Sequence, residues 1–226
     1  MVLIIFSVVL FVAWAYFYAR KEGLSDGDIK DMLLHPREYT SSGRAGERFL
    51  YRSLLEVGVS KEQIFRNVYI PALGKDGKEN GKTTEIDILV VARKGVLVFE
   101  HKARTGNIYG SADREQWVQY LGKSKFFLQN PIQQNRYHKK CLEKYIEGKA
   151  PIYTFITTSN NGKWKIQGDK PEDHIIRREG DFRKMYEELP DCVDMGKEYK
   201  GLLEKFHSKS RPKDGTAERH IRDFCL

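Results

Sequence analysis

Cysteine is scarce in this chain, and its pattern excludes two common ways of stabilising a fold. The 226 residues include three cysteines, Cys141, Cys192 and Cys225, which are widely spaced and odd in number. No CxxC pair occurs, and no cysteine–histidine spacing is typical of zinc ligands. Neither a disulfide framework nor a zinc site is therefore expected, and a reducing compartment suits the soluble part best.

Charge is absent from residues 1–19, which are dominated by aliphatic and aromatic side chains. A helix of this length spans roughly 28 Å at about 1.5 Å per residue, close to the hydrocarbon thickness of a bilayer. Three aromatic residues gather toward its C-terminal end, as interfacial aromatics do: Trp14, Tyr16 and Tyr18. Positive charge follows at once in Arg20 and Lys21. We expect a transmembrane anchor with its N-terminus outside and the body of the protein in the cytoplasm.

A cleavable signal peptide is the alternative interpretation of the same segment. Ala13-x-Ala15 resembles a cleavage site. However, a signal peptide has a basic region at its start and a shorter apolar stretch, and this chain has neither feature. The pattern therefore favours an uncleaved anchor.

No internal repeat and no low-complexity tract is present, and the length suffices for one domain with a sizeable core plus appendages. The formal net charge is +8 and the sequence pI is about 9.2. A basic balance of this size favours an anionic partner, either nucleic acid or an acidic membrane leaflet.

Hydrophobic patterning predicts an α/β layered domain. The expected helices are 43–57, 130–147, 181–189 and 197–207, and the expected strands are 65–70, 83–92, 95–102, 152–158 and 174–177. Segment 74–82 is expected to be a loop and 106–122 to be irregular, with Trp117 and Tyr120 as packing anchors. The order of helix, three strands, helix and strand predicts a mixed sheet flanked by helices.

Two strongly apolar runs carry charged residues at neighbouring ends. Asp87 stands near the start of the run 84–91, and Glu100 and Lys102 end the run 95–102. Side chains alternate along a strand, so Glu100 and Lys102 share a face and His101 points away. If the runs pair antiparallel, Asp87 lies beside that acid–lysine pair. Two carboxylates that share a divalent cation, with a lysine nearby, suit hydrolysis of a phosphodiester. Solvated strand-end charges are the alternative.

Further motifs surround these runs in a fixed order. They are Gly43-x-x-Gly46-Glu47, Glu85-Ile86-Asp87, the run 95–102, Gly106-Asn107-Ile108, Trp117 and Asn130-Pro131-x-x-Gln134-x-x-x-His138. This set resembles the nuclease-related domain (NERD) family, within the PD-(D/E)xK restriction-endonuclease-like superfamily. The resemblance covers roughly residues 43–146. It implies a restriction-endonuclease-like α/β fold, and a membrane anchor before the domain also occurs in that family.

The resemblance also implies a role for each site residue. Glu47 is expected to be a helix-borne acid facing the site, Asp87 the central metal ligand and Glu100 the second ligand. Lys102 is expected to position or activate the attacking water, and Gln134 to reach the same pocket from its helix. Mg²⁺ is the expected cation, with Mn²⁺ as a possible substitute, because both accept carboxylate oxygens.

The chain departs from the general motif at two positions. Ile86 occupies the place of the usual proline, and His101 stands where small polar residues are more common. We expect His101 to pack away from the acids, Glu85 to be a solvated strand-end acid and His138 to be structural. Several basic residues are candidates for phosphate contacts, with ordinary surface positions as the alternative: Arg104, Arg114, Lys123, Lys125, Lys139 and Lys140.

These expectations define a domain plan and a function. Residues 1–19 form the transmembrane anchor, 20–42 a juxtamembrane linker, 43–190 the nuclease-related domain and 191–226 a C-terminal helix with a loose tail. The predicted function is a membrane-anchored, divalent-metal-dependent nuclease, with DNA favoured over RNA as the substrate. The alternatives are a catalytically silent tether for nucleic acid or protein, and a structural protein whose basic face rests on anionic lipid. The complete Glu47, Asp87, Glu100 and Lys102 set favours the enzyme.

Overall fold

The computed structural model describes residues 16, 50–102, 104, 106–158, 162–176, 181–192 and 195–210. Apart from Tyr16, the expected anchor 1–19 lies outside these residues, as do the expected linker 20–42 and Glu47. Within the described residues, no helix is long and apolar enough to cross a membrane. The first described element is the helical segment 50–56, which belongs to the helix expected at 43–57.

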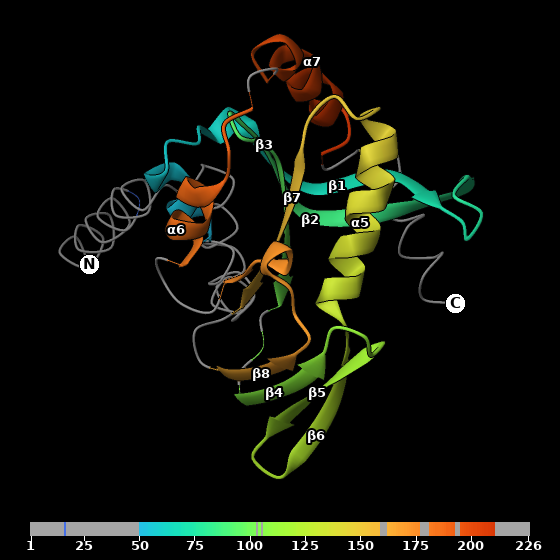
Figure 1. Cartoon of the computed structure of the whole chain (residues 1–226), viewed down its shortest axis with the longest axis vertical. Coiled ribbons are helices and arrows are strands. Elements are labelled where there is room, and N and C mark those ends of the chain that lie inside the picture. The colour runs from blue at the N-terminus through green and yellow to red at the C-terminus, as the bar shows by residue number, and fades with distance from the viewer. Residues whose placement is uncertain are drawn as a thin grey trace, which may run out of the picture.

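The main sheet, sheet A, has five strands in the order β1-β2-β3-β7-β9 (Figure 1). Their bounds are β1 Ile64–Leu73, β2 Glu79–Ala92, β3 Gly95–Lys102, β7 Ile152–Thr158 and β9 Ile175–Ile176. The first three strands pair antiparallel, whereas β7 lies parallel to β3 and β9 lies parallel to β7. The expected mixed sheet is therefore confirmed.

Sheet A is central because its strands are apolar on both faces. One core cluster lies beneath two helices, α5 Pro131–Tyr145 and α7 Met195–His207, and includes Val98 and Leu142. The other cluster lies beneath the segment 50–56 and α6 Asp181–Glu188, and includes Phe99 and Phe182. Burial on both faces explains why β2 and β3 have continuous apolar runs rather than alternating ones.

A second sheet, sheet B, corrects the sequence prediction for 106–122. Its strands are β4 Gly106–Ser111, β5 Gln116–Leu121, β6 Ser124–Gln129 and β8 Gly162–Gln167, in the order β6-β5-β4-β8. The expected irregular segment thus contains two regular strands. Their outward positions are occupied by polar and aromatic residues in short runs between glycines, so hydrophobic periodicity gave a weak signal. Trp117 is fully buried as expected, whereas Tyr120 is 40% exposed and is not a packing anchor.

Other boundaries also differ from the sequence prediction. Strand β1 continues through Pro71, and β2 begins at Glu79, inside the segment expected to be a loop. Two short 3-10 helices complete the described elements, η1 Lys61–Gln63 and η2 Pro171–Asp173. After α7 the chain pairs with the outer edge of β1, because Val68 forms a bridge with Ser210. The described start of the expected loose tail is therefore ordered by sheet A.

Helix α5 links the two sheets (Figure 1). Asn130 caps its first turn by accepting hydrogen bonds from the backbone N–H groups of Ile132 and Gln133, and Pro131 occupies the first turn as expected. The Asn130 amide also donates to three carbonyl oxygens of the β4–β5 connection, at Ser111, Ala112 and Arg114. The start of α5 is thus fixed to sheet B, while the rest of the helix packs on sheet A.

Candidate active site

The acid of β2 and the acid of β3 meet at one end of the antiparallel pair. Ile88 pairs with Phe99, so the next position on each strand brings Asp87 beside Glu100. The Asp87 carboxylate accepts a hydrogen bond from the backbone N–H of His101 at 2.9 Å. The side chain of Asp87 is therefore held against the end of β3, at the place that the alternation argument predicted.

Glu100 and Lys102 point to the same side of β3 and form a close ion pair. Lys102 Nζ lies 2.6 Å from Glu100 Oε1, with side-chain exposures of 20% and 2% respectively. Lys102 Nζ also donates to Gln134 Oε1 at 3.1 Å. The acid on the strand, the lysine and the amide on α5 thus form one connected polar chain.

Helix α5 is fixed laterally by polar contacts of two residues that closely follow Gln134. Asn135 donates to the carbonyl oxygen of Phe155 on β7 at 2.9 Å. The Tyr137 hydroxyl bonds to both backbone groups of Leu73 on β1, at 2.8 Å and 3.0 Å. These contacts set the rotation of the helix, and so they position Gln134 and His138 over the strand ends.

The two carboxyl groups have raised pKa values because they are withdrawn from water. Burial, and after it the nearby Glu100, raise the pKa of Asp87 to about 7, although the His101 N–H and Lys102 oppose the shift. Burial also raises the pKa of Glu100, against the lowering effect of Lys102. A perturbed acid pair of this kind inside a pocket is a frequent feature of catalytic sites.

One oxygen of the acid pair is available for a further partner. Glu100 Oε2 is buried and has no hydrogen-bond partner among the described residues, and its nearest recorded contact is His138 Nδ1 at 3.8 Å. No group of three or more His, Cys, Asp and Glu side chains in the described ranges is arranged to hold a metal. Mg²⁺, however, is commonly held by one or two carboxylates with waters and substrate phosphates. Asp87 and Glu100 fit that requirement, while Glu47, the third expected ligand, lies outside the described residues.

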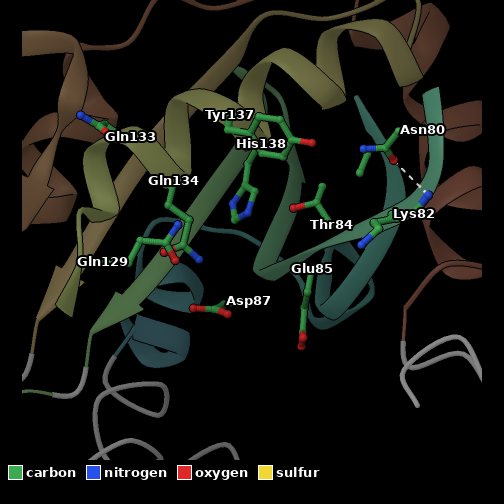
Figure 2. A pocket seen from close by; sticks show the side chains of 11 residues that line it. Asn80, Lys82, Thr84, Glu85, Asp87, Gln129, Gln133, Gln134, Tyr137 and His138 are labelled. Carbon is green, nitrogen blue, oxygen red and sulfur yellow. Dashed lines mark hydrogen bonds between the residues drawn. The ribbon is translucent and has the colours of Figure 1, made fainter. Parts of the chain in front are cut away.

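Asp87 lines a pocket of about 770 Å³ (Figure 2). Strand β2 lines one side with Asp87 and Glu85, and α5 lines the other with Gln134 and His138. The remaining lining residues are Ala72, Asn80, Lys82, Thr84, Gln129, Gln133 and Tyr137. Polar groups from β2, β6 and α5 therefore converge on one hollow, which is the general form of a ligand site.

The structure separates the remaining candidates. His101 lies on the opposite face of β3, where its Nδ1 is 2.7 Å from the Thr157 hydroxyl of β7. Glu85 accepts a hydrogen bond from Asn67 at 2.7 Å on the rim of the pocket. His138 is 3% exposed beside Glu100. His138 therefore belongs to the surroundings of the acid pair, whereas His101 supports the sheet behind it.

Sequence reasoning missed Asn67. It lies on β1 opposite Asp87 of β2, between the regular residue pairs Arg66–Ile88 and Val68–Ile86. Asn67 has a left-handed backbone, with φ of 50°. Phe65 and Val68 contribute to the same core cluster, as do Ile86 and Leu89, so both strands shift their alternation by one residue at this point. The tolerance of asparagine for this conformation is the single local signal in the sequence. The irregularity lets Asp87 leave the regular ladder and reach the end of β3.

Comparison with known proteins identifies the family of this chain. Residues 42–177 match the model of the nuclease-related domain family. An uncharacterized protein of Bacillus anthracis is 30% identical over 153 residues, which cover 67% of this chain and 66% of that relative. No solved structure matches the chain. Because the family match spans more than half of the sequence and includes Asp87, Glu100, Lys102 and Gln134, the chain belongs to the nuclease-related domain family.

Proposed function

We propose that this protein is a divalent-metal-dependent nuclease that hydrolyses phosphodiester bonds, with DNA favoured over RNA. The observation that carries the proposal is the meeting of Asp87 and Glu100, both with raised pKa values, beside the ammonium group of Lys102. Family membership supports the nuclease-related part of the proposal. The acid and acid-x-lysine arrangement supports the PD-(D/E)xK type, and with it a restriction-endonuclease-like fold.

Asp87 and Glu100 are the residues that would hold Mg²⁺ or Mn²⁺, together with Glu47 as the expected third ligand. A bound divalent cation supplies charge stabilisation at the scissile phosphate and lowers the pKa of a coordinated water. Both carboxylates are suited to bind a cation. Glu100 Oε2 accepts no hydrogen bond among the described residues, and the Asp87 carboxylate is held in position by the His101 N–H. Occupancy by a cation would also remove the repulsion between the two acids.

Lys102 has a separate task in this proposal. Its ammonium group is fixed by Glu100 on one side and Gln134 on the other. A positive charge held beside the acid pair stabilises negative charge that develops on a phosphate and orients an attacking water. Gln134 is a positioning residue, because it contacts Lys102 rather than the reacting atoms.

We further propose that residues 1–19 anchor the protein in a membrane with the nuclease-related domain on the cytoplasmic side. The proposal rests on the uncharged apolar stretch and on the basic residues that follow it. Protease protection of a C-terminal epitope in intact and permeabilised cells tests the orientation. Cleavage of that epitope in intact cells would contradict it.

The direct test is cleavage by the full chain, purified in mild detergent. A panel of end-labelled single-stranded, duplex and junction DNA and RNA is incubated with Mg²⁺, Mn²⁺ or chelator. We expect cleavage with the metals, none with chelator, and a loss of at least about 100-fold for Asp87→Asn and for Glu100→Gln.

Glu79→Gln is the matched control, because Glu79 is an exposed acid at the far end of the same strand. It is expected to cut like the wild type. Folded wild-type protein that cuts no member of the panel under any metal condition would overturn the enzymatic proposal. In that case salt-sensitive, chelator-insensitive DNA binding would support a silent nucleic-acid tether instead.

A further inference from the structure

The solvent-facing side of sheet B has an unusual distribution of charge. The four strands of this sheet contain three lysines, Lys125, Lys163 and Lys165, and no acidic residue. Cross-strand partners share a face, so the register places all three lysines on one side. We call this side the outer face; it consists of Asn107, Tyr109, Gln116, Val118, Tyr120, Lys125, Phe127, Gln129, Lys163, Lys165 and Gln167.

Aromatic rings stand among these lysines. Tyr109 and Tyr120 are each 40% exposed and Phe127 is 60% exposed. The Tyr109 and Tyr120 rings meet edge to face with centroids 5.7 Å apart. Lys165 Nζ lies 5.5 Å from the centre of the Tyr109 ring, and Lys125 Nζ lies 4.9 Å from that of Phe127. Two of the three lysines therefore lie directly over exposed aromatic rings of the same face.

Core packing does not account for these exposed rings. The opposite side of sheet B supplies the core, where Trp117, Leu128 and Ile108 pack with residues of α5, β7 and β9. The outer face of a sheet of this kind is usually covered by polar side chains, and exposed aromatic clusters mark interaction surfaces. A hollow of about 680 Å³ on this sheet is lined by residues that include Tyr109, Lys165 and Arg114.

The outer face is continuous with the candidate active site. Gln129 ends β6, pairs with Gln116 on the outer-face register, and also lines the pocket that contains Asp87. Phe127 and Lys125 lie two and four residues before Gln129, which is about 7 Å and about 13 Å along the strand. A polymer bound on the outer face therefore has a short path to the acid pair.

We propose that the outer face of sheet B binds single-stranded nucleic acid and delivers it to the pocket. Unpaired bases stack on Tyr109, Tyr120 and Phe127, and backbone phosphates lie against Lys125, Lys163 and Lys165. Exposed rings favour a single strand over a duplex, because the bases of a duplex already stack on one another. The proposal rests on the proposed nuclease function for its substrate class, and it adds where the substrate is held.

The aromatic part is tested by binding to a fluorescent 30-nucleotide oligo(dT) in chelator, which prevents cleavage. Full-length protein is used with Phe127→Ala and with the Tyr109→Ala/Tyr120→Ala double variant. We expect the dissociation constant to rise about tenfold for each. Phe126→Ala is the matched control, because Phe126 is 48% exposed on the same strand but points to the other side. It is expected to bind like the wild type.

The charge part is tested by the Lys125→Gln/Lys163→Gln/Lys165→Gln triple variant. On a single strand, each lost phosphate contact makes the slope of log binding constant against log salt concentration about 0.7 units less steep. Loss of the three lysine contacts is therefore expected to reduce the slope by about 2 units. The control is the Lys170→Gln/Lys184→Gln/Lys200→Gln triple variant, at exposed lysines outside sheet B. It has the same net charge as the test variant and is expected to keep the wild-type slope.

The outcomes separate this proposal from the nuclease proposal. If the wild type binds oligo(dT) and the outer-face variants bind weakly, the outer face is supported even when no cleavage occurs. If the protein cuts nucleic acid and the outer-face variants bind and cut like the wild type, the proposal that the outer face binds nucleic acid is overturned. The nuclease proposal then still stands. Loss of binding to anionic lipid vesicles alone, with oligo(dT) binding unchanged, would also overturn it and indicate a membrane-facing surface.

Discussion

In sheet A the acids Asp87 and Glu100 are withdrawn from water and held by hydrogen bonds or an ion pair, whereas in sheet B the lysines of the strands all stand on the solvent-facing side. Glu100 is 2% exposed and bonded to Lys102, and Asp87 is held by a backbone N–H. Lys125 and Lys165, in contrast, lie exposed over aromatic rings. A buried charge changes its pKa and requires partners, while an exposed charge acts through long-range attraction.

This difference assigns the chemical step and substrate binding to different sheets of one molecule. The burial that makes it unfavourable to ionise the sheet A acids also makes them strong ligands for a cation, because less water competes for their oxygens. The sheet B lysines are exposed, so their charges carry little desolvation cost. The same exposure lets them contact a polyanion. Substitutions in sheet A should therefore change the chemical step, and substitutions on the outer face of sheet B should change binding.

The largest expected contrast is between a lysine of each sheet. Lys102→Met is expected to lower kcat by at least about 100-fold with little change in KM, because it removes a fixed charge from the reaction centre. Lys165→Gln is expected to raise KM and leave kcat unchanged. Steady-state cleavage of labelled DNA measures both constants, and circular dichroism checks the fold. Equal effects of the two substitutions on kcat would remove the proposed division of work.

The next contrast is between a glycine on the packed side of sheet B and a glycine with no neighbouring atoms in α7. An added Cβ on Gly110 would lie 2.5 Å from the Trp117 ring, which is fully buried between the sheets. Gly110→Ala is therefore expected to destabilise the protein by about 2 kcal/mol through overpacking, measured by urea unfolding. Gly201→Ala in α7 meets no neighbouring atom and is expected to stabilise by about 0.5 kcal/mol. An unchanged stability for Gly110→Ala would show that the Trp117 contact is easily relieved.

The buried acids predict a pH dependence that the outer face lacks. The pKa of Asp87 is raised from 3.8 to about 7, so the stability associated with its neutral form is fully present below about pH 4 and is lost as the pH rises through about 7. In chelator, Asp87→Asn is thus expected to raise Tm at pH 8.5 by at least about 2 °C and to raise it by less than half as much at pH 5, which lies near the lower end of this window. Lys165→Gln serves as the control and is expected to change Tm by the same small amount at pH 5 and at pH 8.5. A gain at pH 5 equal to that at pH 8.5 would contradict the assignment.

The smallest expected effect is at Gln134, which holds Lys102 from α5. Gln134→Ala is expected to lower kcat about tenfold without changing KM, because Lys102 remains paired with Glu100 but loses one of its two supports. Glu143→Ala, an exposed position further along the same helix, is expected to have no effect. A loss at Gln134 as large as that of Lys102→Met would mean that the amide contacts the substrate itself.

The acid and lysine positions were predictable from sequence because they depend on local rules. Alternation along β3 places Glu100 and Lys102 together and turns His101 away, and the short connection between β2 and β3 makes antiparallel pairing the natural choice. The N-terminus of α5 was equally clear, since Asn130 and Pro131 are strong start signals. These parts of the site needed no long-range information.

Sheet B and the irregularity at Asn67 were not predictable in the same way. The strands of sheet B are short and polar on one side, and β8 pairs with β4 across more than fifty residues of sequence. Asn67 takes its left-handed backbone within the pairing of β1 with β2. Pairing between strands decides both features, and the local sequence carries only a weak signal for them.

The sequence by itself determined the chemistry of this protein: which acids, which lysine and which amide are available, and the order in which strands and helices present them. Tertiary structure alone decided how dry the acid pair is, which oxygen of Glu100 stays unbonded within the described residues, and that the β4–β6 region forms a sheet whose end reaches the pocket. The physical reason is that side-chain type and alternation are properties of neighbouring residues, whereas burial, pKa and a shared surface arise only when distant segments pack together.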